Sequence, residues 1–258
     1  MSPQVQRLCT PIYRQIKQGP KRGFSQRLRR EFPDYDDQVI ETICRVRRAT
    51  MTSPQCVAAL CQAVRYIVRG NVPGAVVECG VWKGGSMMAV ARTLQQLDAS
   101  RDLYLFDTFA GMTAPTDADK TQSGRLAVNR LGPATLKHLE VSMETVAANM
   151  ASTGYSDALT HYVRGPVEET LPGAAPDSIA LLRLDTDWYE STRHELEVLY
   201  PRLSPGGILI IDDYGDWQGA KLAVDEYFAE TAVFLNRIDY TARLMVKPAA
   251  ALAGQLTG

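Results

Sequence analysis

Short apolar runs alternate with amphipathic segments from residue 75 onward, and this alternation constrains the fold more than any other feature of the chain. The apolar runs have the length and composition of buried strands, and the segments between them have the periodicity of helices. We expect strands at residues 75–79, 103–107, 159–164, 179–185 and 207–212, and helices at residues 85–97, 136–150, 190–203 and 219–230. Strands and helices that alternate in this way form βαβ units, and therefore a parallel sheet covered on both faces.

The end of the chain predicts a different strand arrangement. Residues 237–240 and 242–247 have the pattern of an antiparallel hairpin at the sheet edge. The expected fold class is therefore α/β, with a doubly wound, mostly parallel, Rossmann-like sheet and an antiparallel C-terminal edge hairpin. In such sheets ligands bind beyond the carboxyl ends of the strands, so the residues that follow each strand are the candidates for function.

Residues 1–70 have a different character, basic and helical. A run of lysines and arginines between residues 17 and 30 predicts an exposed loop or lid, and residues 37–48 predict a helix. Ser53 and Pro54 have the types favoured at the N-cap and first position of a second helix, which ends near Gly70. We therefore divide the chain into a helical N-terminal extension, residues 1–70, and a second domain, residues 71–258.

Composition excludes several classes of protein. The chain has 258 residues, of which 45% are hydrophobic, enough to fill a large core. Its 28 Lys and Arg residues balance 29 Asp and Glu residues, which argues against a nucleic-acid or membrane partner. Five cysteines without a CxxC pair argue against a disulfide framework or a zinc knuckle. No apolar run has the length of a signal peptide or membrane span, so we expect a soluble, cytoplasmic protein.

A glycine-rich loop follows the first strand and opens a helix. In Glu78 to Ser86, glycines let backbone N–H groups approach a ligand at a helix N-terminus. The spacing differs from the dinucleotide GxGxxG pattern, and Glu78 would repel a pyrophosphate. A ligand with a cationic or neutral group, such as the amino-acid end of S-adenosylmethionine, is more compatible with Glu78. Asp107, after the second strand, has the place of the acid that binds ribose in Rossmann-like folds, although either acid could instead be a cap or turn residue.

Three acids follow two later strands: Asp185 ends one, and Asp212 and Asp213 end the next. Neighbouring parallel strands lie about 4.8 Å apart, so these carboxylates are expected to share a small volume, where they raise one another's pKa. An oxygen-liganded cation relieves the repulsion, with Mg²⁺ preferred and Mn²⁺ or Ca²⁺ as substitutes. The alternative is a capping role. The three histidines share no pattern, so zinc is disfavoured.

Four motifs in order resemble the macrocin O-methyltransferase (TylF) family: VECGVWKGGS at residues 77–86, LFDTFAGM at 105–112, LRLDTDWY at 182–189, and the segment from SPGG to DDY at 204–214. The resemblance covers residues 50–228 and implies a class I methyltransferase fold. It also implies a Mg²⁺-dependent enzyme that transfers a methyl group from S-adenosylmethionine to a sugar hydroxyl in natural-product (antibiotic) biosynthesis. A more distant similarity links the chain to catechol O-methyltransferase.

Carried over by position, the resemblance implies a role for each motif residue. The implied cofactor contacts are Met51, Thr52, Glu78, Gly80, Trp82, Ser86, Asp107, Thr108, Gly165 and Asp185. Among them, Glu78 and Ser86 hold the methionine end, Asp107 binds ribose and Gly165 lies near the adenine. The implied metal ligands are Asp185, Asp212 and Asp213. In this family the N-terminal extension shapes the acceptor pocket, and its lid often lies at subunit contacts, so we expect a homo-oligomer.

Two positions depart from the relatives and affect the expected chemistry. Trp188 replaces the lysine of catechol methyltransferases, and Asp216 stands where many relatives have histidine. We therefore expect Asp185 to be the proton acceptor as well as a metal ligand, with Asp187 as second choice. The expected acceptor is a hydroxylated small molecule, most simply a glycoside. The alternatives are a catechol-like acceptor, a non-catalytic S-adenosylmethionine-binding module, and a nicotinamide-dependent oxidoreductase, for which the dinucleotide fingerprint is missing.

Overall fold

The computed structural model describes residues 21–248. Its elements in chain order are α2 (Lys21–Glu31), α3 (Asp37–Val46), α4 (Pro54–Arg69), β1 (Ala75–Cys79), α5 (Gly85–Gln96), β2 (Leu103–Asp107), α6 (Ala127–Arg130), α7 (Pro133–Leu139), α8 (Met143–Ala151), the 3₁₀ turn η1 (Asp157–Leu159), β3 (Thr160–Arg164), α9 (Val167–Thr170), β4 (Ile179–Leu184), α10 (Tyr189–Leu199), β5 (Leu203–Ile211), α11 (Gln218–Tyr227), β6 (Asn236–Arg237) and β7 (Arg243–Val246). Within this part of the chain, no helix combines the length and apolar character that a membrane span requires.

The strands form one sheet in the order β3-β2-β1-β4-β5-β7-β6. The first five pair in parallel, whereas β7 runs antiparallel to β5 and β6 antiparallel to β7. This confirms the predicted mostly parallel sheet and its antiparallel C-terminal edge. The strand order reverses between β1 and β4, which creates the crevice where doubly wound folds bind ligands.

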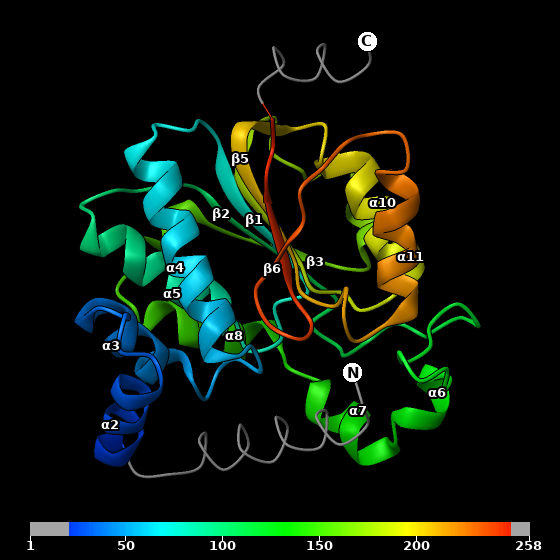
Figure 1. Ribbon diagram of the computed structural model, residues 1–258, viewed down its shortest axis with the longest axis horizontal. Coiled ribbons are helices and arrows are strands. Elements are labelled where there is room, and N and C mark those ends of the chain that lie inside the picture. The colour runs from blue at the N-terminus through cyan, green and yellow to red at the C-terminus, as the bar shows by residue number, and fades with distance from the viewer. Residues whose placement is uncertain (1–20, 249–258) are drawn as a thin grey trace.

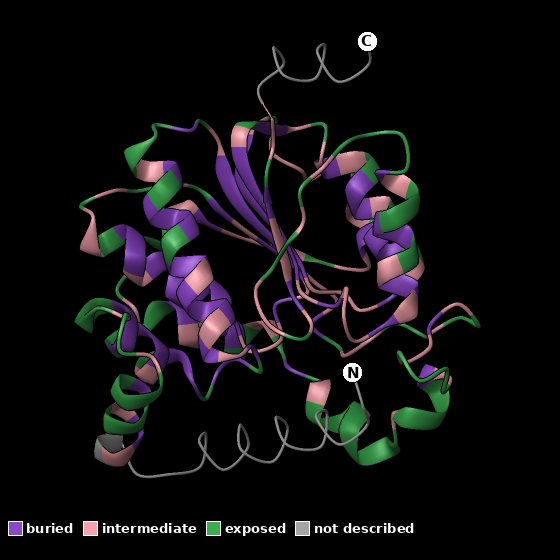
Figure 2. Cartoon of the chain, viewed as in Figure 1, coloured by how far each residue is buried: buried purple, intermediate pink, exposed green. Residues whose placement is uncertain are grey.

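Helices cover both faces of the sheet, as Figure 1 shows, with α4 and α5 on one side and α10 and α11 on the other. Each face has its own apolar cluster, and β1 and β4 are buried along their whole length (Figure 2). Strands covered on both faces have nearly continuous apolar sequences, so the bounds of β1 and β4 could be predicted closely from the sequence. Each of these helices buries one face against the sheet and exposes the other, and this gives its sequence an amphipathic pattern.

The prediction of an exposed loop before residue 37 was wrong for the described part of that segment. Residues 21–31 form α2, because Phe24 and Leu28 lie four positions apart on one face and are both buried in the core. Arg27, Arg29 and Arg30 are exposed on the remaining faces. Residues 1–20 and the C-terminal residues 249–258 lie outside the described residues.

Capping residues set the start of the next two helices. Asp36 caps α3 by accepting from Val39 N, and Ser53 caps α4 by accepting from Cys56 N at 3.1 Å, as predicted. Helix α4 packs on α5, and both belong to the same apolar cluster as one sheet face. The helices of residues 21–69 therefore add a layer to the sheet, and the division at residue 70 stays a prediction.

The single helix predicted for residues 136–150 is two helices in the structure. Helix α7 ends at Leu139, the backbone is extended at Glu140, and α8 begins at Met143. Ser142 caps α8 by accepting from Thr145 N at 3.3 Å. A serine whose side chain bonds the backbone locally competes with helix continuation, and periodicity alone does not reveal that competition.

Candidate functional site

A cavity of about 980 Å³ lies at the carboxyl ends of the parallel strands. The loops after β1, β2, β4 and β5 line it, together with residues from 50–56, 130–139 and 237–241. All but one of the residues predicted from the sequence line this cavity: Met51, Thr52, Gly80, Trp82, Ser86, Asp107, Thr108, Gly165, Asp185, Asp212 and Asp213. Glu78 is buried beneath it, with 1% of its surface exposed.

The glycine loop packs tightly against the loop that follows β4. Gly80 has a φ of +81°, and a Cβ atom there would lie 2.1 Å from the carbonyl oxygen of Asp185. Asp185 N donates to Cys79 O at 2.9 Å, so the two loops are joined by a backbone hydrogen bond. Only glycine satisfies both the dihedral angle and the close approach.

Asp107 anchors the glycine loop, a role that the sequence patterns did not predict. Its Oδ2 accepts from the backbone N–H groups of Val81 at 2.8 Å and Trp82 at 3.1 Å, and its Oδ1 accepts from Phe109 N at 2.8 Å. Three backbone donors thus use most of the accepting capacity of one carboxylate. The contact between Asp107 and a ribose stays a prediction.

Arg183 is the second feature that the sequence patterns did not predict. Its guanidinium is 3% exposed and contacts Glu78 Oε1 and Asp185 Oδ2, both at 2.6 Å, and Asp212 Oδ1 at 2.8 Å. Burial raises the pKa of Glu78 to about 7, against the lowering effect of this guanidinium. The available signal was a charged residue inside the apolar run of β4, since buried charges require partners.

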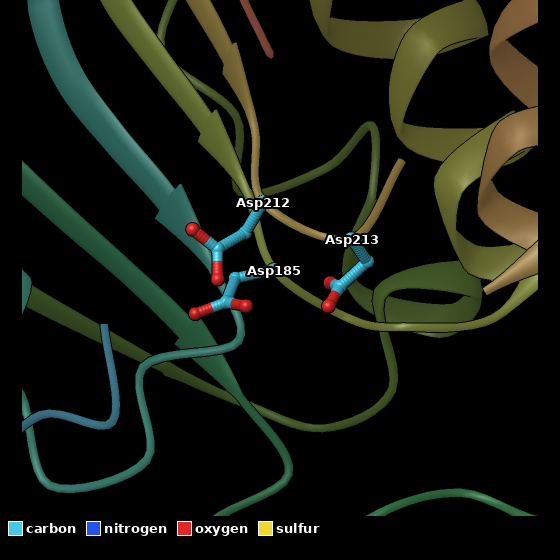
Figure 3. Close-up of side chains that lie close together, drawn as sticks. All are labelled: Asp185, Asp212 and Asp213. Atoms are coloured by element: carbon cyan, nitrogen blue, oxygen red, sulfur yellow. The ribbon is translucent and has the colours of Figure 1, made fainter. Parts of the chain in front are cut away.

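The three predicted metal ligands converge, as Figure 3 shows, with Asp185 following β4 and Asp212 and Asp213 following β5. One carboxylate oxygen from each lies within 4.8 Å of the others. Burial and the neighbouring acids raise the pKa of Asp213 well above its usual range, and burial raises that of Asp185 despite Arg183. Three convergent carboxylates are an oxygen donor set that suits Mg²⁺.

Asp187 lies beside the triad in a left-handed conformation, with a φ of +69°. Its Oδ1 accepts from the Trp217 indole Nε1 at 2.7 Å. Burial raises its pKa to about 7, against the lowering effect of that hydrogen bond. Trp188, which replaces the lysine of catechol methyltransferases, is buried edge-on against Trp217 and takes no place in the cavity lining.

The segment around α6 borders the cavity on the side of Trp217. The Arg130 guanidinium lies 4.7 Å from the centre of the Trp217 ring, and Arg130 Nη2 pairs with Asp216 Oδ2 at 3.1 Å. Asp216, the residue that departs from the relatives, therefore holds α6 beside the cavity.

Comparisons with known proteins agree with this geometry. The demethyldecarbamoylnovobiocin O-methyltransferase of Streptomyces niveus is 36% identical over 170 residues, which are 66% of this chain and 63% of the relative. This chain thus spans less than two thirds of that relative's length. The 8-demethyl-8-(2,3-dimethoxy-alpha-L-rhamnosyl)-tetracenomycin-C 4'-O-methyltransferase of Streptomyces olivaceus is 34% identical over 183 residues, 70% of this chain and 69% of the relative.

The structure and the family model point the same way. The solved structure of the O-methyltransferase NovP has a TM-score of 0.69 and 33% identity, and the match covers 78% of this chain and 83% of NovP. The model of the macrocin O-methyltransferase (TylF) family matches residues 21–247, which include every described helix and strand. On this evidence the chain belongs to the macrocin O-methyltransferase (TylF) family.

Proposed function

We propose that this protein transfers a methyl group from S-adenosylmethionine to a sugar hydroxyl of a glycosylated small molecule, with the help of a divalent cation. The observation that carries the proposal is the cavity itself. The glycine loop, Trp82 and three convergent carboxylates all line it. Family membership supports methyl transfer as the reaction.

A buried carboxylate oxygen without a hydrogen-bond partner supports the proposed position of the cofactor. Glu78 Oε2 is buried and has no hydrogen-bond partner among the described residues. A buried acceptor that receives no hydrogen bond destabilises the folded protein. The ammonium group of S-adenosylmethionine would be a suitable donor to this oxygen. Ser86 and Gly80 line the cavity and would contact the methionine portion.

The carboxylate end has room for one cation. Asp185, Asp212 and Asp213 would hold Mg²⁺, with Mn²⁺ or Ca²⁺ as substitutes, and the ion would lower the pKa of an acceptor hydroxyl and fix its direction. The cavity would bring the acceptor and the methyl donor together, which supplies part of the rate acceleration.

Two contacts support Asp187 rather than Asp185 as the residue that would remove the hydroxyl proton. Asp185 Oδ2 accepts from Arg183, and Asp185 also belongs to the group of acids expected to hold the cation. Asp187 lines the cavity outside that group, and its Oδ1 is oriented by the Trp217 indole. We therefore propose that Asp187 is the proton acceptor, and the role expected for Asp185 stays a prediction that Asp185→Asn and Asp187→Asn test together.

The relatives guide the choice of acceptor. The name of the S. olivaceus relative describes a methyltransferase that acts on a rhamnosyl-bearing tetracenomycin. A cavity of about 980 Å³ lies at the upper end of the range for ligand pockets, so it can take the cofactor and a sugar together. We propose a deoxysugar of a glycosylated aromatic or macrolide product as the acceptor class.

Isothermal titration with S-adenosylhomocysteine and with Mn²⁺ tests the proposal. The wild-type protein is expected to bind both, and the Asp212→Ala/Asp213→Ala double variant is expected to lose the cation while it keeps the nucleoside. Methyl transfer is then measured with glycosides and with catechol. Failure to bind the nucleoside would refute the methyltransferase function, and turnover of catechol alone would refute the sugar acceptor.

A further inference from the structure

Arg183 is the charged residue of β4, where every other position is apolar and all are buried. Its Nη1 lies 2.6 Å from both Glu78 Oε1 and Asp185 Oδ2, and its Nη2 lies 2.8 Å from Asp212 Oδ1. Nη2 also donates to Thr52 Oγ1 at 3.1 Å. One guanidinium therefore touches the acid expected at the cofactor and two of the three acids expected at the cation.

The contacts divide the carboxylate oxygens into two sets. Arg183 contacts one oxygen of each acid: Glu78 Oε1, Asp185 Oδ2 and Asp212 Oδ1. Among residues 21–248, Glu78 Oε2 is buried without a hydrogen-bond partner, and no donor reaches Asp185 Oδ1 or Asp212 Oδ2. Asp212 Oδ1 meets Arg183 as an ion pair, without the geometry of a hydrogen bond. The free oxygens are the ones that ligands could use.

We propose that Arg183 is a positioning residue for both ligand sites at once. The inference rests on the proposed function, and it adds that a single side chain orients the acid facing the cofactor and two acids facing the cation. Groups that orient metal ligands from behind typically change metal affinity by about 10-fold to 100-fold when they are removed. Here the same group is expected to affect nucleoside affinity as well.

The geometry explains why arginine is needed. A guanidinium presents a flat, rigid fork of donors, and here two of its nitrogens reach three carboxylates and a hydroxyl. A lysine keeps the positive charge but has one nitrogen on a flexible stem. Arg183→Lys therefore separates orientation from charge.

The test is to measure both affinities in Arg183→Lys by isothermal titration, with S-adenosylhomocysteine in the absence of metal and with Mn²⁺ in the absence of nucleoside. We expect both dissociation constants to rise about 10-fold or more. Two single-site variants calibrate the result, since neither residue contacts Arg183: Ser86→Ala is expected to weaken the nucleoside alone, and Asp213→Asn the cation alone.

A matched control comes from another buried arginine, Arg65. The Arg65 side chain is 10% exposed and pairs with Asp36, and neither residue lines the cavity. Arg65→Lys removes the same kind of fork at a distance from both sites. We expect it to change thermal stability while both dissociation constants stay within about 2-fold of wild type, so a general loss of stability is distinguished from a loss of orientation.

The outcomes separate this inference from the proposed function. A wild-type protein that binds neither ligand would refute the function. If the wild-type protein binds both ligands and Arg183→Lys binds both equally well, or loses only one, the proposed role of Arg183 is overturned.

If circular dichroism shows that Arg183→Lys is unfolded, the wild-type protein supplies a second measurement. Slowly exchanging side-chain N–H signals of the buried arginine are expected to shift in ¹⁵N NMR with either Mg²⁺ or nucleoside, and a response to one ligand alone would overturn the inference.

Discussion

The Trp217 indole Nε1 donates a 2.7 Å hydrogen bond to Asp187 Oδ1 at the edge of the cavity. Trp217 is 3% exposed and packs edge-on against Trp188 at a ring separation of 5.0 Å. A buried indole held in this way has little rotational freedom. The hydrogen bond therefore fixes the carboxylate of Asp187, whose left-handed backbone already points it away from the regular path of a strand.

Trp217→Phe is expected to lower kcat about 10-fold and to change the affinity for S-adenosylhomocysteine by less than about 2-fold. Phenylalanine keeps the edge-on packing but loses the donor, so Asp187 becomes free to rotate away from the acceptor proton. Steady-state kinetics and titration of the nucleoside measure the two quantities. A wild-type kcat in Trp217→Phe would contradict the role proposed for Asp187.

Arg130→Ala is expected to raise the KM for the acceptor about 3-fold to 10-fold and to leave nucleoside binding unchanged. The substitution removes the ion pair with Asp216 and the contact with the Trp217 ring, which together contribute about 1 kcal/mol. Asp216→Asn removes the ion pair alone and is expected to have a smaller effect. Equal KM values for the two variants and wild type would show that α6 does not shape the acceptor pocket.

Gly80→Ala is expected to disrupt the site far more than Gly124→Ala, although the two glycines have nearly the same φ, +81° and +83°. A Cβ on Gly124 meets nothing within 4 Å, so that change adds only the left-handed backbone cost of about 1–2 kcal/mol. A Cβ on Gly80 would collide with the Asp185 carbonyl, so the loops after β1 and β4 must separate. Chemical denaturation and nucleoside titration compare the variants, and equal effects would contradict the close approach of these loops.

Asp239→Asn is expected to destabilise the protein near pH 7, by about 1–2 kcal/mol, and to have little effect near pH 2. Burial raises the pKa of Asp239, but hydrogen bonds from Ala242 N, the Ser53 hydroxyl and Thr241 N outweigh it and lower that pKa below its usual range. A carboxyl with a lowered pKa in the folded protein stabilises it above the unfolded-state pKa, and this stabilisation disappears as the pH falls through the folded-state pKa. Urea denaturation across this range checks the prediction, and a difference between the proteins that does not change with pH would contradict it.

Local sequence patterns determined most of the architecture. The strands β1 and β2 begin and end at the predicted residues, because strands covered on both faces are mostly apolar. Ser53 and Pro54 located the start of α4 because capping is a contact between residues three positions apart. Parallel pairing of β4 with β5 brings the acids at their carboxyl ends together, so the strand pattern of the sequence is enough to predict the triad.

Tertiary structure decided what those acids contact. The ion pair between Glu78 and Arg183 joins residues 105 positions apart, and Asp107 reaches back 26 positions to Val81 N. Periodicity shows that a position is buried but not which distant group it meets, so neither the shared guanidinium nor the anchored loop could be predicted from it. The same reason explains α2, whose burial of Phe24 depends on neighbouring helices. Sequence determined which groups stand at the strand ends, and packing over long chain separations decided which oxygens are occupied and which are free for ligands.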